Sequence, residues 1–257
     1  MKNLSLGFIG GGRITRIFLQ AFKNKSVHFE EIAVFDTNGD VLNSLKHSFP
    51  EIDIVEDVSL IATKKVVFIA LHPPVIMETL SKIKNQLADD AIMVSLAPKF
   101  TIAKISSLTG KNNVVRLIPN ATSFINEGYN PVSFPGNFDP DKKLQITELL
   151  TLLGKTFEVA ENRLESYAIV SAMLPTYFWF QWEEMRKIGL LTGLSENEAS
   201  EAIYETLHAA LNLMFKSGLT YAEVVDLIPV KPIMEHESEI RHIFQTRLPA
   251  LFEKIKP

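Results

Sequence analysis

Three consecutive glycines near the start of the chain could bind the phosphates of a nucleotide. They follow an apolar run and precede a segment of helical periodicity, which is the setting of a dinucleotide-binding fingerprint. Gly10 would permit a tight turn, Gly12 would let the backbone approach a pyrophosphate, and the N–H groups that open the helix would face that anion. Thr15 stands where the fingerprint has its third small residue. The pattern predicts cofactor binding by Gly10, Gly11, Gly12, Arg13 and Ile14. The alternative is a glycine turn in a protein that has lost its cofactor.

An acidic residue follows the second apolar run, where the adenosine ribose would lie. A carboxylate here, at Asp36, usually accepts hydrogen bonds from the ribose hydroxyls and would repel a 2′-phosphate. No Arg or Lys follows within three residues to offset that repulsion. The position favours NAD over NADP, with a turn cap as the alternative role for Asp36.

Short apolar runs and helical segments alternate up to about residue 160. The predicted strands are Leu4–Ile9, Ile32–Phe35, Ile52–Val55, Val66–Ala70, Ile92–Ser95, Val114–Ile118 and Thr156–Val159. The predicted helices between them are Arg13–Phe22, Gly39–His47, Val75–Gln86, Thr101–Leu108 and Asp141–Leu153. Continuous apolar runs are typical of parallel strands covered by helices on both faces. Residues 1–160 are therefore predicted to form an α/β Rossmann-type doubly wound sheet.

Helical patterns fill residues 161–257, and no further strand is predicted. The segment 164–191 is predicted as one long helix with a kink at Pro175. Ser195 and Glu198 form a capping box that opens a second helix with a single apolar stripe. A last helical stretch begins near Met234 and is predicted to be interrupted by Pro249. Because helices of this kind would be poorly covered in a monomer, we expect an all-α domain that forms a homodimer or a larger homo-oligomer.

The composition excludes several classes of protein. The 257 residues include 26 basic and 30 acidic side chains and no cysteine, so disulfides, a thiolate nucleophile and Cys-ligated metals are excluded. No apolar run approaches the ~20 residues of a membrane-spanning helix, and the glycine run comes too early for a signal-peptide core. The net charge of −4 argues against nucleic acid as the main ligand. The sequence thus predicts a cytoplasmic protein with a small-molecule substrate and no nucleic-acid or membrane partner.

Five motifs together resemble the pyrroline-5-carboxylate reductase family, over about Leu6 to Gly218. The most specific is Val115-Arg116-Leu-Ile-Pro119-Asn120 with the trailing Glu127-Gly128, since it is not a general feature of nucleotide-binding folds. The others are Gly7-Phe-Ile-Gly10-Gly-Gly12, Val66-Val-Phe-Ile-Ala-Leu-His72-Pro73, Val94-Ser-Leu-Ala97, and Leu153-Gly154-Lys155.

The resemblance implies hydride transfer from a reduced nicotinamide cofactor, NAD(P)H, to a cyclic imine acid, which gives proline. It also implies a helical domain through which subunits dimerise. Asn120 would lie near the nicotinamide end. The cofactor would be lined by Gly10, Gly12, Asp36, Ala70, His72, Pro73, Ser95 and Ala97.

The chain departs from the family where the substrate should lie. Two glycines of a small-residue run are replaced by Ala172 and Leu174, although Pro175 and Tyr177 remain. A later Ser-Pro-Gly-Gly-Thr-Thr run is replaced by residues 230–235, Val-Lys-Pro-Ile-Met-Glu, without glycines or hydroxyls. Lys99 follows Pro98 where the family has a glycine. The family's substrate residues therefore cannot be transferred to this loop.

Hydride transfer needs a positioned nicotinamide and a proton source. His72 follows the fourth predicted strand at the edge where ligands of such sheets bind, and Tyr177 is kept from the family pattern, so both are catalytic candidates. Solvent or phosphate contact is the alternative for His72, and packing is the alternative for Tyr177. Lys231 could pair with a substrate carboxylate. The charged triplet Glu235-His236-Glu237 lacks further ligands, so no metal site is predicted.

Three functions stay open on the sequence. The first is an NAD(P)H-dependent reductase of a small imine or carbonyl acid. The second is a reductase that uses another hydride carrier, such as a deazaflavin, since relatives with this N-terminal domain pair NADP with one. The third is a nucleotide-binding sensor or assembly partner without turnover.

Overall fold

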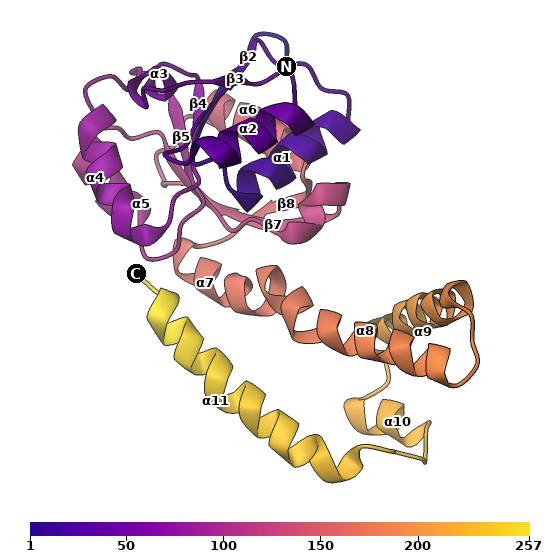
Figure 1. Ribbon diagram of the computed structural model, residues 1–257. Helices are drawn as coiled ribbons and strands as arrows, with labels where there is room; N and C mark the ends of the chain where they lie inside the picture. Colours follow the sequence, from indigo (N-terminus) through magenta and orange to yellow (C-terminus); the bar gives the residue numbers. More distant parts are fainter. The chain divides into compact units, whose positions relative to one another are not determined.

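The computed structural model describes the backbone of residues 1–257 and every side chain except that of Pro74. The chain forms two compact units, one of residues 1–172 with 252–257 and one of residues 173–251 (Figure 1). The domain boundary predicted near residue 160 lies inside the first unit.

The first unit is built on one eight-stranded sheet with the strand order β3-β2-β1-β4-β5-β6-β7-β8. Neighbouring strands are parallel except for β6 and β7. The strand bounds are β1 Ser5–Ile9, β2 Glu31–Phe35, β3 Asp53–Ile54, β4 Val66–Ile69, β5 Ile92–Ser95, β6 Val114–Leu117, β7 Gly128–Ser133 and β8 Gly154–Glu158. Because β1 lies between β2 and β4, the strand order reverses there, which is where doubly wound sheets bind ligands.

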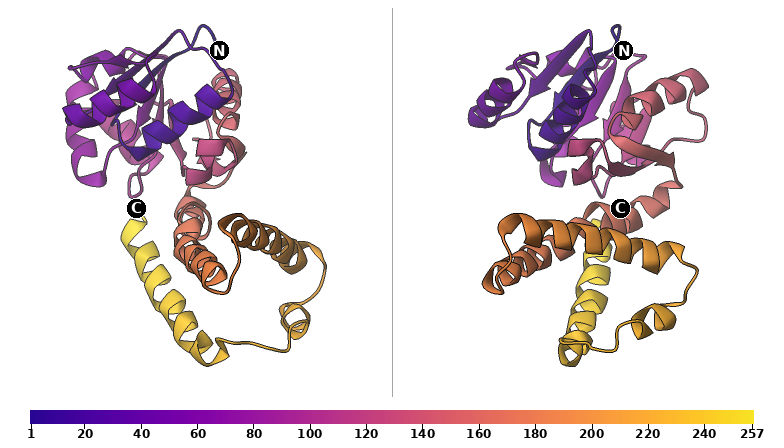
Figure 2. Two further views of the ribbon diagram at one scale, coloured as in Figure 1. Left: turned by 45° about the vertical axis from the view of Figure 1, so that its right-hand side comes forward. Right: turned by 90° about the vertical axis from the view of Figure 1, so that its right-hand side faces the viewer.

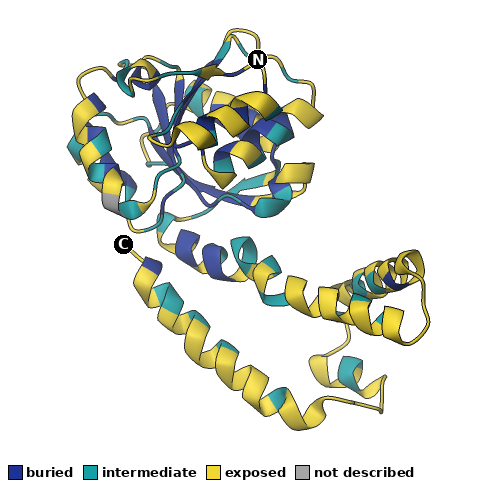
Figure 3. Cartoon of the chain, viewed as in Figure 1, coloured by how far each residue is buried: buried dark blue, intermediate teal, exposed yellow. Residues whose placement is uncertain are grey.

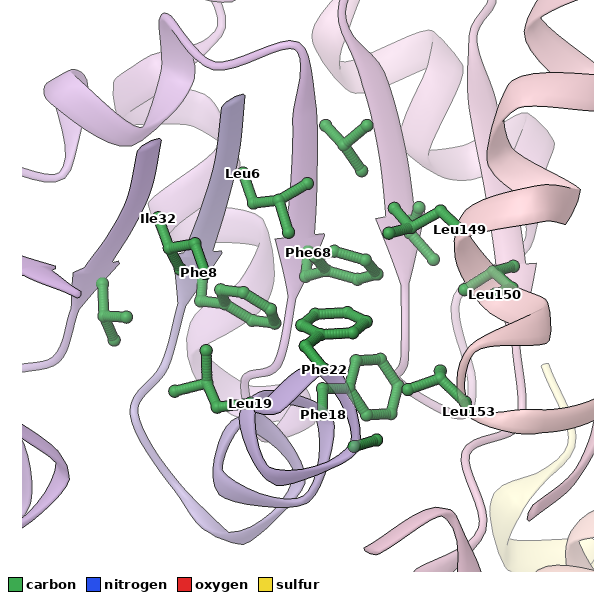
Figure 4. Packing of buried hydrophobic residues seen from close by; sticks show 14 of the residues in the cluster. Leu6, Phe8, Phe18, Leu19, Phe22, Ile32, Phe68, Leu149, Leu150 and Leu153 are labelled. Carbon is green, nitrogen blue, oxygen red and sulfur yellow. The ribbon is translucent and has the colours of Figure 1, made fainter. Parts of the chain in front are cut away.

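Helices cover both faces of this sheet (Figure 2). The helices of the first unit are α1 Arg13–Asn24, α2 Gly39–Ser48, α3 Ser59–Ala62, α4 Pro73–Ile83, α5 Ile102–Thr109, α6 Pro140–Thr151 and α7 Leu164–Tyr167. One core packs α1, α2 and α6 on the sheet, and the other packs α3, α4 and α5. In the first core the Phe8 and Phe68 rings stack at 4.7 Å, and Phe18 meets Phe68 edge-on (Figure 4). The predicted Rossmann-type fold is confirmed.

Strand β7 was not predicted, because its sequence contains residues that are rare in strands. Gly128 and Pro131 both weaken a strand assignment, and Pro131 has no N–H to donate. Its carbonyl still accepts a hydrogen bond from the Ile118 N–H at 3.1 Å, and Asn130 is fully buried. Pairing with β6 and β8 overrides the local preference.

The second unit is helical, with α8 Leu174–Leu191, α9 Glu196–Lys216, α10 Tyr221–Asp226 and most of α11 Glu237–Ile255. The Ser195–Glu198 capping box is present at the start of α9. Two predictions were wrong. The segment 164–191 is not one helix, since a π-helical turn at 168–172 and a bend at Met173 separate α7 from α8. Conversely, α11 continues through Pro249, although proline removes one helical hydrogen bond.

Across the described residues, every helix is too short or too polar to span a bilayer.

Candidate functional site

The glycine turn joins β1 to α1 at the carboxyl edge of the sheet. Gly10 has a φ of +107°, and a Cβ there would lie 2.5 Å from the Ala70 carbonyl oxygen, so the turn requires glycine. Its N–H donates to the Phe35 carbonyl at 2.7 Å. The turn is thus held against the ends of β2 and β4.

Thr15 stabilises the turn rather than disrupting it. Its hydroxyl donates to the Gly10 carbonyl at 2.5 Å, and the side chain is fully buried. The hydrogen bond of Thr15 therefore holds α1 to the glycine turn at a position where the fingerprint usually has a glycine or alanine.

The start of α1 fits an anion. Gly12 is the N-cap residue, and no side chain caps the helix. A Cβ on Gly12 would meet no atom within 4 Å. The first N–H groups of α1, at Arg13 and Ile14, have no side-chain cap and could bind a pyrophosphate.

Asp36 holds two backbone segments together. Its Oδ2 accepts from the Gly11 N–H at 2.7 Å, and its Oδ1 accepts from the Asn38 N–H at 2.9 Å. Asn38 in turn caps α2 through the Asp40 and Val41 N–H groups. The turn-capping role considered for Asp36 is therefore present.

A pocket of about 370 Å³ opens beside the glycine turn, between α1 and α2. Two cations line it, Arg13 and Arg16, with Asp40, Ser44 and Ser48 from α2. Arg16 was missed in the sequence because its one-turn spacing from Arg13 carried no motif.

The predicted residues after β4 and β5 lie at the same edge. His72 is exposed and forms the N-cap of α4, with Pro73 in its first turn. Ser95 and Ala97 are buried, and in the described part of the chain the Ser95 Oγ has no hydrogen-bond partner. A buried hydroxyl without a partner at this edge fits a polar group of a bound cofactor.

Asn120, which follows β6, organises the loop that it begins. Its Oδ1 accepts from the N–H and the hydroxyl of Thr122, at 3.1 and 2.9 Å. Its Nδ2 donates to the Ser171 Oγ at 3.4 Å, and its N–H donates to the Asn130 Oδ1 at 3.1 Å. The Pro-Asn motif therefore fixes the backbone beyond β6.

The arginine of the same motif forms a buried ion-pair cluster that sequence reasoning did not predict. Arg116 is 1% exposed and bonds to Glu165, itself 2% exposed, and to Glu161 at 3.2 Å. Glu161 also accepts from the Ile102 N–H that opens α5, at 2.7 Å. An arginine inside the apolar run 114–118 was the available signal, since buried charges are nearly always paired.

Tyr177 belongs to the second unit, whereas the residues above belong to the first. It lines a pocket of about 430 Å³ between α8 and α11, where its ring meets Phe244 edge-on at 5.9 Å. Burial raises the pKa of the Tyr177 phenol above its ordinary value, so the phenol holds its proton more tightly. Lys231, Glu235 and His236 are exposed, and Glu237 is partly buried and pairs with Arg241. Among the described residues, no group of three or more His, Cys, Asp or Glu side chains could hold a metal ion.

Comparisons with known proteins agree with this geometry. The family model for "NADP oxidoreductase coenzyme F420-dependent" matches residues 5–99. The pyrroline-5-carboxylate reductase of Staphylococcus epidermidis is 22% identical over 224 residues, which cover 86% of this chain and 83% of that protein. The Staphylococcus aureus enzyme of the same name is 23% identical over 225 residues, with the same coverage of both.

The resemblance to pyrroline-5-carboxylate reductases is confirmed. With it, the predicted class, an NAD(P)-dependent oxidoreductase, is confirmed as well. Among solved structures, the Plasmodium falciparum pyrroline carboxylate reductase with NADP bound superimposes with a TM-score of 0.81 at 18% identity, over 100% of this chain and 98% of that one. The Coxiella burnetii enzyme gives 0.71 at 22% identity, over 99% and 95%. At these identities the structural likeness establishes the fold.

Proposed function

We propose that this protein reduces a small cyclic imine acid, of the pyrroline-5-carboxylate type, with NAD(P)H. The observation that carries the proposal is the glycine turn. The positive φ of Gly10, the uncapped start of α1 and the open space beside Gly12 all support a phosphate site at this turn. The turn follows β1, where the strand order reverses.

The residues of the carboxyl edge have separate tasks in this reaction. When bound here, a reduced nicotinamide would supply the hydride for the imine carbon of the substrate, and the imine nitrogen of the substrate would take up a proton, so that C=N becomes CH–NH. Gly10–Ile14 would hold the pyrophosphate, and the loop begun by Asn120 would support the nicotinamide end. His72 is exposed at this edge and stays a candidate proton donor, as does Tyr177 through its neutral phenol.

Two features beside the glycine turn bear on the choice between NAD and NADP. The Asp36 position favours NAD, but both of its oxygens already accept backbone N–H groups. The pocket beside the turn contains Arg13 and Arg16, whose guanidinium groups suit a phosphate. We therefore propose NADPH as the tighter ligand.

The apolar surface of the second unit supports a homodimer. In the described part of residues 173–251, Ala199 is the one buried residue, while Phe215 is 77% and Leu191 86% exposed. A groove of about 570 Å³ between α8 and α9 is lined mainly by apolar side chains, among them Trp182 and Leu211. Exposed apolar area of this extent marks an interface, and a second copy is the simplest partner. That the protein acts in the cytoplasm stays a prediction.

The test is a fluorescence titration with NADPH and NADH, followed by pyrroline-5-carboxylate and measurement of cofactor oxidation at 340 nm. We expect binding, tighter for NADPH, and oxidation that depends on the imine acid. Binding without oxidation would favour another substrate or a protein without turnover. A lack of binding to both nucleotides would contradict the proposal.

A further inference from the structure

We propose that Lys99 binds the carboxylate of the substrate, an inference that rests on the reductase function proposed above. Lys99 lies in the loop between β5 and α5, four residues after the last residue of β5. Strands β4, β5 and β6 are parallel neighbours, so the loops that follow them meet at one edge of the sheet. His72, Lys99 and Asn120 therefore come from three successive loops at the edge where the nicotinamide end is expected.

The backbone at Lys99 is strained. Its φ is +72°, a left-handed conformation that residues with a Cβ rarely adopt. Both sides of the residue are anchored: Ala97 and Phe100 are buried, and Thr101 caps α5 through the Lys104 N–H at 3.1 Å. Strain that the surroundings impose in this way is concentrated at functional sites.

Two other residues with a side chain have positive φ, and their settings differ. Ser26 lies in the turn between α1 and β2, at the opposite edge of the sheet. Asn126 is of a type that tolerates this conformation, and its side chain bonds to the Ala21 and Leu152 carbonyls at 2.9 and 2.7 Å. In the described part of the chain Lys99 has no such structural bond, so its side chain does not stabilise the loop in the way that the Asn126 side chain does.

The ammonium of Lys99 is available to a ligand. The side chain is exposed, and within the described residues it has no ion pair or hydrogen bond. The next lysine along the chain is engaged, since the Lys104 Nζ lies 4.8 Å from the centre of the Phe100 ring. Arg13 belongs to the phosphate turn, and Arg116 beside the end of β5 is paired with Glu161 and Glu165. Lys99 is the cation of the loop between β5 and α5 and could hold an acid group there. An ammonium–carboxylate hydrogen bond would orient the ring for hydride transfer.

The test separates carboxylate binding from turnover. The protein is saturated with NADPH and titrated with tetrahydrofuran-2-carboxylate and with tetrahydrofuran-2-carboxamide, two unreactive rings that differ in charge. NADPH fluorescence or calorimetry reports the affinity. We expect the wild type to prefer the carboxylate by about tenfold or more. Lys99→Gln should remove that preference with the NADPH affinity unchanged, and Lys99→Arg should retain most of it.

Two further variants separate the ammonium of Lys99 from general positive charge and from the shape of the loop. Lys104→Gln, a matched control in the same region, should keep the preference, which shows that general positive charge is not the cause. Lys99→Gly should lose the preference and raise the melting temperature, because glycine relieves the strained φ.

The outcomes distinguish this inference from the proposed function. If NADPH binds and Lys99→Gln keeps the preference for the carboxylate, Lys99 is not the carboxylate ligand and the proposed function is unaffected. If NADPH binds but the wild type shows no preference for the carboxylate, the inference is likewise wrong. If NADPH does not bind, the proposed function fails and the role of Lys99 fails with it.

Discussion

The two units of this chain differ in how far their apolar side chains are buried. In the first unit the central strands β1, β4, β5 and β6 are wholly buried between two helical layers, whereas the helices of the second unit are mostly exposed along their length (Figure 3). Trp179 and Phe180, for example, are 49% and 64% exposed on α8. The first unit therefore has a core of its own, and the second needs another surface to bury its apolar residues.

The same contrast holds for charge. Arg116 is buried with two carboxylates in the first unit, while Arg186 in the second unit pairs with Glu183 and Glu196 at the surface. Removing one partner of a buried pair leaves the other charge buried and uncompensated. When one partner of an exposed pair is removed, water solvates the charge that remains. The buried arginine should therefore matter far more to folding.

The largest expected effect is that of Arg116→Met on stability. We expect the free energy of unfolding of the first unit to fall by about 3–5 kcal/mol, because Glu165 would remain buried without a cation. Urea denaturation followed by circular dichroism measures it. Arg186→Met is the matched control and should leave the midpoint unchanged, and Arg116→Met with Glu165→Leu should recover part of the loss. Equal midpoints for the two single variants would contradict the contrast in charge.

The next effect is on cofactor binding by the first unit. Gly12→Val should weaken NADPH binding by about 100-fold or more, since the side chain would occupy the space that the pyrophosphate needs. The fold should be unaffected, because a Cβ at Gly12 meets no atom within 4 Å. Gly136→Val, at a loop glycine with equally open surroundings, is the control. A folded Gly12→Val protein with normal NADPH affinity would show that the phosphate site lies elsewhere.

The sequence predicted the first unit better than the second for a physical reason. Runs such as Val66–Ile69 are apolar throughout because both faces of the sheet are covered, and that pattern is local. Strand β7 depends on its neighbours in the sheet, so its Gly and Pro residues concealed it. The break between α7 and α8 falls just before Pro175, where the sequence indicated a kink but not a π-helical turn.

In the candidate site, too, features that depend on neighbouring residues could be predicted, and features that join distant segments could not. The glycine turn could be predicted because its chemistry depends on neighbouring residues, at Gly10 and Gly12. The two backbone bonds of Asp36 and the ion pairs of Arg116 join segments far apart in the sequence, so spacing alone could not reveal them. The strain at Lys99 is likewise a property of the folded loop.

A smaller effect should show whether the exposed apolar surface of the second unit forms a dimer interface. Leu211→Glu places a charge in the groove between α8 and α9, where Leu211 is 58% exposed in a single chain. We expect the dimer to dissociate at micromolar concentration, with NADPH binding by the first unit retained. Sedimentation velocity measures the mass, and Glu201→Ala on the same helix is the control. A wild type that sediments as a monomer would contradict the dimer outright.

The smallest effect concerns the phenol in the pocket between α8 and α11. Because burial raises the pKa of Tyr177, its folded form holds the proton to higher pH than its unfolded form does. Stability should therefore fall as the pH rises above the unfolded value near 10, and Tyr177→Phe should remove that part of the fall. An absorbance titration at 295 nm should show one tyrosine ionising last in the wild type and missing in the variant. A second copy that covered the pocket between α8 and α11 as well as the groove would bury Tyr177 further, and the shift in its pKa should then shrink in Leu211→Glu.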